Sequence, residues 1–377
     1  MLIDFTVENY RSIREPVTLS LLARNSLSEY SQSLFAFRKD RILSQVMILG
    51  ANGAGKTSLL KALQAGIQIL KNSLTLQPHD RISGLDPFVL DDHSGSKPSR
   101  FEYTMVLNGQ RFVYGFLADS DQIVGEYLYS YSSSGIRESQ SVVFERKQTE
   151  YYIPARHRKL QKLIFCTPAN RLFLGVAYEF QEPVCQEIFE HLTSGFLPAF
   201  PEETERQEEK LLNRLAAGSL HHETLERLMQ EADLGIEIEN GRHGLSWKEE
   251  SAGSRRFLVL LALALQALEE GKVMLVDDLE QGLHPLLMGQ LTRLFSDPKI
   301  NTRQAQLVFT AHDPLLLMTG HLRRGQILLV EKDRDTRTTQ LYSLADFSPR
   351  REENILKNYL IGRYGAIPRV SEAWIDA

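Results

Sequence analysis

The chain has 377 residues, a formal net charge of −5, 42% hydrophobic residues and 24% charged residues. This composition is ordinary for a globular protein with a sizeable core, and it excludes a disordered or fibrous chain. The longest apolar run, 257–265, is about half the ~20 residues that cross a bilayer, and no apolar stretch follows a basic start near Met1. We therefore expect neither a membrane span nor secretion.

The cysteine content indicates whether the protein works in a reducing or an oxidising compartment. Only Cys166 and Cys185 are present, with no metal-ligand pattern around them. A disulfide framework and a cysteine-rich zinc site are therefore disfavoured, and a reducing cytoplasm fits. The small negative charge argues against a uniformly basic surface but leaves room for a local basic footprint for nucleic acid.

The first part of the chain predicts two strands and then a strand–loop–helix unit. Apolar and polar residues alternate over 3–8 and again over 17–21, with a turn at 9–12 between them. The apolar run 46–49 predicts a strand buried on both faces. Helical spacing that begins at Leu59 predicts a helix after a glycine-rich turn.

The middle and the last third of the chain have different hydrophobic patterns. Alternation over 101–153, with the turn Asn108-Gly109, predicts an antiparallel β lobe, and 169–234 has a helical pattern far shorter than a long coiled coil. A helix over 254–270, a strand over 273–276, a helix after Pro285 and strands over 307–310 and 327–330 follow. Alternating strands and helices predict the α/β class, with a mostly parallel sheet covered on both faces.

A glycine-rich segment, GANGAGKT at 50–57, lies between the predicted buried strand and the helix. This pattern is typical of a phosphate-binding loop: glycines let backbone N–H groups converge on phosphate oxygens, and the helix N-terminus adds partial positive charge. Lys56 is expected to reach the β and γ phosphates, and the Thr57 hydroxyl is expected to bind Mg²⁺. The expected phosphate-binding residues are Asn52, Gly53, Ala54, Gly55, Lys56, Thr57 and Ser58.

Two other predicted strands end in polar side chains. Strand 273–276 leads into Asp277 and Asp278, and strand 307–310 leads to His312. We expect Asp277 to hold Mg²⁺ through water and Asp278 to orient or deprotonate an attacking water. A lone histidine after a strand is usually structural. The presence of the phosphate loop and the acidic strand in the same chain favours a role for His312 at the ligand-binding edge of the sheet.

The most apolar helix opens with Ser251-Ala252-Gly253-Ser254. This start is either a simple N-cap or an anion site for a γ-phosphate. A helix start on the opposite face cannot reach its own phosphate loop, so the second interpretation requires another copy of the protein.

In order, the segments 50–57, 251–253, 277–278, 282–285 and His312 resemble the phosphate loop, signature, acidic strand, D-loop and switch histidine of ATP-binding cassette ATPases. The start FTVENYRSI at 5–13 looks like the SMC, RecF and OLD branch of that superfamily. The segments DLEQGLHP at 278–285 and YLIGRYGAIP at 359–368 resemble the AAA-type ATPases of bacterial abortive-infection and phage-defence operons.

The resemblance implies an ATPase head that binds ATP and Mg²⁺ and forms a homodimer with two nucleotides sandwiched between opposed subunits. It divides the chain into the first part of the ATPase core with the phosphate loop (1–75), an antiparallel β lobe (76–155), a helical insertion (156–244), the second part of the core with the signature, acidic strand, D-loop and switch histidine (245–345), and a C-terminal helical extension (346–377).

The resemblance also assigns roles to individual residues. Lys56, Asp278 and His312 are the expected catalytic residues, with His312 sensing the γ-phosphate, and Thr57 and Asp277 are the expected metal site. Ser251 and Gly253 would contact the partner's nucleotide. Asn9 and Arg11 would touch the nucleotide from the N-terminal turn.

One residue departs from the superfamily pattern. Asp278 stands where a catalytic glutamate is usual, and displacement of a reacting group by ~1 Å can cost about 100-fold in rate. We therefore expect slow hydrolysis by a nucleotide-controlled switch in antiphage defence, which acts on a separate nuclease or toxin because the chain shows no effector motif.

Two alternatives stay open: a non-hydrolysing ATP-bound scaffold for an effector, and a DNA-end-binding repair ATPase. The basic cluster at 156–159 with Lys162 is interpreted as a solvated face, and the acidic residues at 331–335 as a hairpin instead of a nuclease motif.

Overall fold

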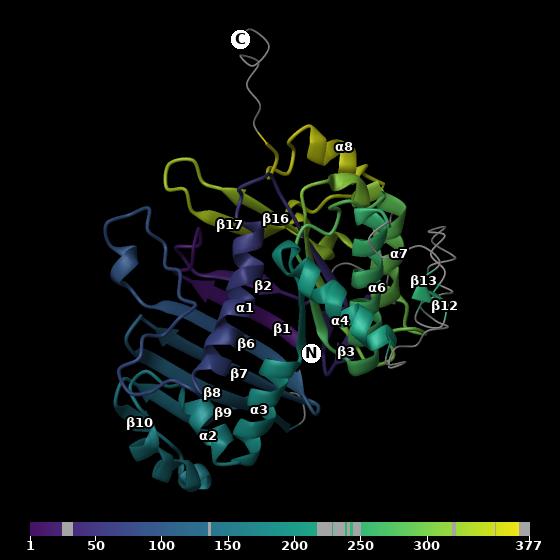
Figure 1. The fold of residues 1–377 in the computed structure, drawn as a ribbon. Helices are drawn as coiled ribbons and strands as arrows, with labels where there is room; N and C mark the ends of the chain where they lie inside the picture. The colour runs from purple at the N-terminus through teal and green to yellow at the C-terminus, as the bar shows by residue number, and fades with distance from the viewer. Residues whose placement is uncertain are drawn as a thin grey trace.

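The computed structural model describes residues 1–24, 33–134, 137–216, 228, 238–239, 242–243, 250–318, 322–350 and 352–368. Two sheets pack against helix α1 (Lys56–Asn72), which contacts strands of both (Figure 1). Because α1 follows the predicted phosphate loop, this packing sets the position of that loop. Most of the segment 217–249, including His221 and His222, lies outside the described residues.

The first sheet has seven strands in the order β10-β9-β8-β7-β6-β1-β2, and every neighbouring pair is antiparallel. Its strands are β1 (Leu2–Glu8), β2 (Val17–Ser20), β6 (Ser99–Leu107), β7 (Gln110–Ala118), β8 (Ile123–Ser134), β9 (Arg137–Lys147) and β10 (Glu150–Tyr152). The sequence assigned β1 and β2 to the ATPase core, apart from the β lobe. The structure joins them to the lobe, because Phe5 of β1 pairs with Tyr103 of β6.

The second sheet has the order β11-β14-β15-β5-β16-β17, parallel throughout except for the β16–β17 hairpin. Its strands are β5 (Gln45–Leu49), β11 (Phe196–Ala199), β14 (Val273–Val276), β15 (Gln306–Ala311), β16 (Ile327–Lys332) and β17 (Thr339–Ser343). The predicted α/β class with a mostly parallel sheet is confirmed. The predicted helical insertion over 156–244 also contains a strand, β11, which forms the edge of this sheet beside β14.

Successive residues of β5 point to opposite faces of the parallel sheet. Val46 and Ile48 join the core that contains α1, while Met47 and Leu49 join the core that contains α6 (Ala252–Glu270) and α7 (Pro285–Ser296). All four are fully buried. This two-sided burial explains the continuous apolar run that the sequence shows at 46–49.

The described residues also include four further α-helices and four further strands. The other helices are α2 (Phe173–Glu179), α3 (Pro183–Ser194), α4 (Thr204–Ala216) and α8 (Ile355–Leu360), and the other strands are β3 (Leu34–Phe37), β4 (Asp40–Leu43), β12 (Ile238–Glu239) and β13 (Arg242–His243). In the described parts of the chain, no helix combines the length and the apolar character that crossing a membrane requires.

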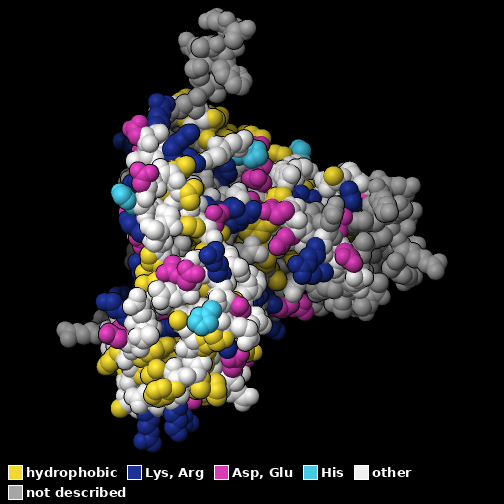
Figure 2. All heavy atoms as spheres, turned by 60° about the vertical axis from the view of Figure 1, so that its left-hand side comes forward, with side chains coloured by type: hydrophobic (Ala, Val, Ile, Leu, Met, Phe, Trp, Pro, Cys, Tyr) yellow, Lys and Arg dark blue, Asp and Glu magenta, His cyan; other side chains and the backbone are white. Residues whose placement is uncertain are grey.

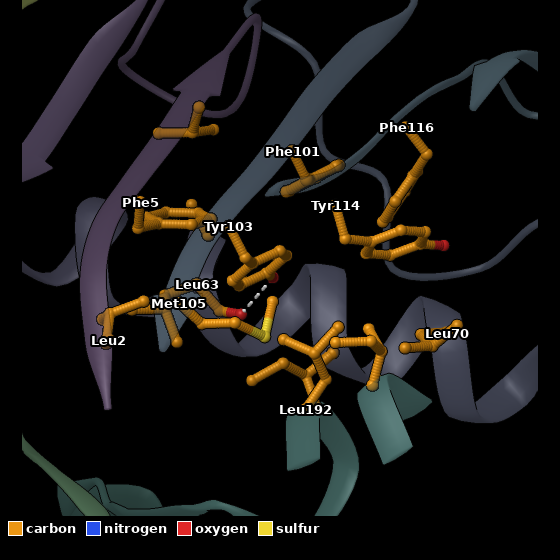
Figure 3. Close-up of a cluster of buried hydrophobic side chains, with 14 of the residues drawn as sticks. Leu2, Phe5, Leu63, Leu70, Phe101, Tyr103, Met105, Tyr114, Phe116 and Leu192 are labelled. Atoms are coloured by element: carbon orange, nitrogen blue, oxygen red, sulfur yellow. Dashed lines mark hydrogen bonds between the residues drawn. The ribbon is translucent and has the colours of Figure 1, made fainter. Parts of the chain in front are cut away.

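Helix α1 approaches the antiparallel sheet closely at Gly66. A Cβ atom there would lie 2.2 Å from the hydroxyl oxygen of Tyr103, which donates a hydrogen bond to the carbonyl of Leu63 at 2.8 Å (Figure 3). Phe101 and Phe116 stack beside this contact with ring centroids 5.2 Å apart. The tight packing fixes α1, and with it the phosphate loop at its N-terminus.

Candidate functional site

Glycine is required at Gly50, Gly53 and Gly55 of the predicted phosphate loop for different structural reasons. A Cβ on Gly50 would lie 2.2 Å from the carbonyl oxygen of Val330, and one on Gly55 would lie 2.1 Å from Oγ1 of Thr339. Gly53 has a positive φ of 75° and nothing within 4 Å of its Cβ position. Two glycines therefore let the loop pack against its own sheet, and Gly53 leaves the outer side open to a ligand.

The end of the loop carries a lysine and a threonine. Lys56 is buried, and its Nζ donates hydrogen bonds to the carbonyls of Gly50 and Ala51 at 2.8 and 3.1 Å. Burial lowers the pKa of Lys56, which nearby carboxylates raise only in part. Thr57 Oγ1 donates to the carboxylate of Asp277, 2.9 Å from Oδ2. The structure thus brings together two of the residues that the sequence placed in one site.

Thr310 connects the acidic strand to its neighbour. This fully buried residue of β15 donates a hydrogen bond from Oγ1 to Asp277 Oδ1 at 2.7 Å and accepts one from the backbone N–H of Asp278 at 2.8 Å. Burial raises the pKa of Asp277, whereas the hydrogen bonds from Thr310 and Thr57 lower it. Hydroxyl and carboxylate oxygens are the ligands that Mg²⁺ prefers, so Thr57 and Asp277 fit that ion.

A second cluster consists of Asp278, Glu280 and His312, which offer ligand atoms within 4.8 Å of one another. His312 Nδ1 lies 2.6 Å from Glu280 Oε1 and 3.9 Å from Asp278 Oδ1. Asp278 has a left-handed backbone with φ of 49°, a conformation in which aspartate is more common than glutamate. The sequence prediction included Asp278 and His312 and missed Glu280.

The start of α6 lies against the D-loop of the same chain. Ser251 caps the helix by accepting a hydrogen bond from the N–H of Ser254 at 3.0 Å. A Cβ on Gly253 would lie 2.4 Å from the carbonyl oxygen of Gly282. Between described residues, no hydrogen bond joins Ser251 or Gly253 to the phosphate loop, and Ser251 is exposed.

The side chains of the N-terminal turn contact the segment 86–97 of the same chain. Asn9 is buried, and its amide donates to the carbonyls of Ser94 and Lys97 at 2.9 and 2.8 Å and accepts from the N–H of Phe88 at 3.1 Å. Its side chain is therefore engaged in holding the segment 88–97. Arg11 Nε donates to Asp86 at 2.8 Å while the Arg11 side chain stays 36% exposed, and its contact with nucleotide remains a prediction.

The hydroxyls of Thr339 and Ser12, which the sequence prediction missed, contact the phosphate loop and the start of α1. Thr339 Oγ1 donates to Ser12 Oγ at 2.8 Å and lies 3.1 Å from the carbonyl oxygen of Ala54. Ser12 Oγ in turn lies 3.2 Å from Ser58 Oγ. Residues from the first part of the chain and Thr339 from near its end thus meet at the phosphate loop.

A cavity of about 980 Å³ opens beside the phosphate loop. The phosphate loop, the switch histidine, the β16–β17 hairpin and the segment that follows α8 form its walls. Its lining residues include Ala51, Asn52, Gly53, Ala54, His312, Lys332, Arg334, Arg337 and Ala366. The Ala51 N–H donates to the carbonyl of Ala366 at 3.1 Å, so the C-terminal segment is part of the wall.

The head domain of SMC from Thermotoga maritima is similar over 91% of this chain and 98% of its own length, with 13% sequence identity and a TM-score of 0.42. No curated protein matches. Residues 46–318 match the profile of a family described as "AAA domain, putative AbiEii toxin, Type IV TA system", which confirms the resemblance to abortive-infection AAA proteins. The chain therefore belongs to this AAA-domain family.

Proposed function

We propose that this protein binds and slowly hydrolyses ATP with Mg²⁺, and that two copies sandwich the nucleotides between them. The observation that carries the proposal is the junction of Thr57 and Asp277, 2.9 Å apart and contributed by two separate motifs. The open side of Gly53 and the adjoining cavity supply space for a triphosphate. The AAA-domain family of the chain supports the same activity.

In the proposed reaction, water attacks the γ-phosphate in line with the leaving group. Lys56 moves from the carbonyls of Gly50 and Ala51 onto the phosphates, where its charge stabilises the transition state. Asp278 orients the water and accepts its proton. Thr57 and Asp277 would hold Mg²⁺, which when bound supplies positive charge at the phosphate oxygens.

Exposed apolar side chains on the segments that follow the D-loop and His312 support dimerisation. Leu286 follows the D-loop and is 69% exposed, and Met318 follows the switch histidine and is also 69% exposed. Ser251 at the tip of α6 is exposed as well. In the proposed dimer, a second copy covers these groups and places its own Ser251 and Gly253 at the nucleotide. The positive N-terminal end of its α6 would then attract the γ-phosphate.

The activity test compares purified wild-type protein with Lys56→Ala in phosphate-release assays with ATP and Mg²⁺. We expect turnover in the wild type, none above background in Lys56→Ala, and unchanged turnover in Lys71→Ala, which removes a charge from the exposed far end of the same helix. Bound ATP that stays intact for hours in the wild type would contradict hydrolysis and favour the alternative of an ATP-bound scaffold.

The dimer test uses Asp278→Asn, which should slow hydrolysis and hold the sandwich closed. Light scattering with ATP and Mg²⁺ should show a dimer for this variant and a monomer when Ser251→Arg is added, because the larger side chain blocks the partner's nucleotide. A Ser251→Arg protein that still dimerises with ATP would refute the sandwich.

The proposed biological role is a nucleotide-controlled switch in antiphage defence that acts on a separate nuclease or toxin. The family description, which names a putative toxin of a toxin–antitoxin system, supports this setting. The test is a plaque assay on bacteria that carry the gene with its neighbours. Protection should be lost with Lys56→Ala, and equal plaque counts for both would contradict the role.

A repair ATPase that binds DNA ends is the weaker alternative. On the face drawn in Figure 2, Lys and Arg side chains are interspersed with Asp and Glu side chains. Arg156 of the basic cluster also donates to Ser141 Oγ and to the carbonyl of Val142, at 3.1 and 2.7 Å. A DNA-stimulated turnover with steep salt dependence would revive this alternative.

A further inference from the structure

Glu280 contacts the segment that carries His312, the predicted switch histidine. Its Oε1 accepts hydrogen bonds from the backbone N–H groups of both His312 and Asp313, the second at 3.2 Å, and lies 2.6 Å from His312 Nδ1. One carboxylate oxygen thus contacts the main chain and the ring of the same histidine. We infer that Glu280 is the positioning residue of His312, an inference that rests on the proposed ATPase function.

The burial of Glu280 shows that this contact is specific. Its side chain is only 6% exposed, and its Oε2 is buried without a hydrogen-bond partner among the described residues. A buried carboxylate is costly unless it is well bonded. Among the described groups, the two N–H groups and the imidazole are those that contact the Glu280 carboxylate, so this carboxylate belongs to the switch loop.

The 2.6 Å contact fixes the form of the imidazole. Two lone pairs at that separation would repel, so Nδ1 must carry a proton directed at Glu280. In the neutral ring this leaves Nε2 as the nitrogen available to ligands. His312 is 47% exposed and lines the cavity beside the phosphate loop, so Nε2 is the nitrogen left to accept a hydrogen bond from the attacking water.

Glu280 and Asp278 therefore have separate tasks. Asp278 is 37% exposed and 3.9 Å from the ring nitrogen, which leaves its carboxylate accessible to water. The buried Oε2 of Glu280 has no such access. Glu280 acts on the reaction through His312 and does not accept the proton of the water itself.

The kinetic test compares Glu280→Ala with Glu280→Gln. The glutamine keeps a carbonyl oxygen that can accept from both N–H groups and from Nδ1, so it should retain turnover within about threefold of wild type. Glu280→Ala should lower kcat by about tenfold or more with little change in KM. If Glu280 were the base, Glu280→Gln would be as inactive as Glu280→Ala, which would overturn the inference.

A double-mutant cycle separates positioning from general support of the fold. Glu280→Ala should lower kcat little further when His312→Ala is already present, because the lost function is the same. Additive losses would contradict the inference. Thermal melting of each variant shows whether the alanine protein folds; if it does not, the comparison with Glu280→Gln still applies.

A spectroscopic test does not depend on hydrolysis. In protein with ¹⁵N-labelled histidine, the His312 ring, assigned by its loss in His312→Gln, should show a protonated Nδ1 and an unprotonated Nε2 at alkaline pH. Glu280→Ala should abolish this preference. A wild-type ring protonated at Nε2 would refute the inference even if ATP is hydrolysed, whereas absent turnover with an Nδ1-protonated ring would refute only the proposed function.

Discussion

Replacement of Thr310 by valine tests whether this hydroxyl organises the acidic strand. Valine has nearly the same shape, so packing inside β15 is retained while two hydrogen bonds are lost. One is the donation to Asp277 at 2.7 Å, and the other is the acceptance from the N–H of Asp278 at 2.8 Å.

The expected cost follows from these two bonds. An N–H group left without a partner away from water costs about 1–3 kcal/mol, and a hydrogen bond to a charged group is worth about 1.5–3 kcal/mol. Because the N–H of Asp278 is only partly buried, we expect Thr310→Val to lower the free energy of unfolding by about 2–4 kcal/mol. The pKa of Asp277 should also rise further, since one of the two hydrogen bonds that lower it is gone.

Urea unfolding at neutral pH measures the effect, with Thr310→Ser as the matched control that keeps the hydroxyl. The serine variant should lose only the cost of one methyl group, about 1 kcal/mol. A Thr310→Val protein within about 0.5 kcal/mol of wild type would refute the reasoning, because it would mean that neither hydrogen bond contributes to stability.

Three further predictions concern the fold that supports the site. Gly66→Ala should destabilise by about 1–3 kcal/mol in thermal melts, because its Cβ would lie 2.2 Å from the Tyr103 hydroxyl, and Tyr103→Phe should recover part of the loss. Glu126→Ala should cost about 3–5 kcal/mol in urea unfolding, because it leaves the buried Arg146 without its carboxylate. Burial lowers the pKa of His191 to about 4, so the unfolded chain binds a proton that the folded protein does not, and stability falls as the pH drops from about 6.5 to 4. His191→Gln should flatten that part of the pH profile, and an unchanged profile would contradict the burial argument.

Features encoded by neighbouring residues could be predicted from the sequence. The phosphate loop is one, because the glycines, Lys56 and Thr57 stand in one short segment between a buried strand and a helix. The two-sided burial of β5 is another, because four consecutive apolar residues are required to fill two cores.

Features that depend on distant residues could not be predicted. From the sequence alone, Thr310 is an ordinary strand threonine, and its role appears only when β15 is placed beside β14. Glu280 precedes the D-loop, and its contact with His312 appears only in the folded structure. The strand β11 was missed because a four-residue segment that contains Pro198 resembles a loop, and its sheet neighbour β14 lies more than 70 residues further along the chain. The order of residues along the chain does not reveal which distant strands and side chains become neighbours.

The contacts around α6 indicate how nucleotide binding would reach the acidic strand. Arg256, one turn into that helix, donates through Nη2 to the carbonyl oxygens of Asp277 and Asp278, at 3.1 and 2.8 Å. Gly253 at the tip packs against the backbone of Gly282 so closely that no side chain fits. The signature tip, the acidic strand and the D-loop are therefore held as one unit. In the proposed dimer, a γ-phosphate that attracts the tip of a partner's α6 would also move the acidic strand whose backbone carbonyls Arg256 holds, so closure of the dimer and assembly of the catalytic groups are expected to be the same event.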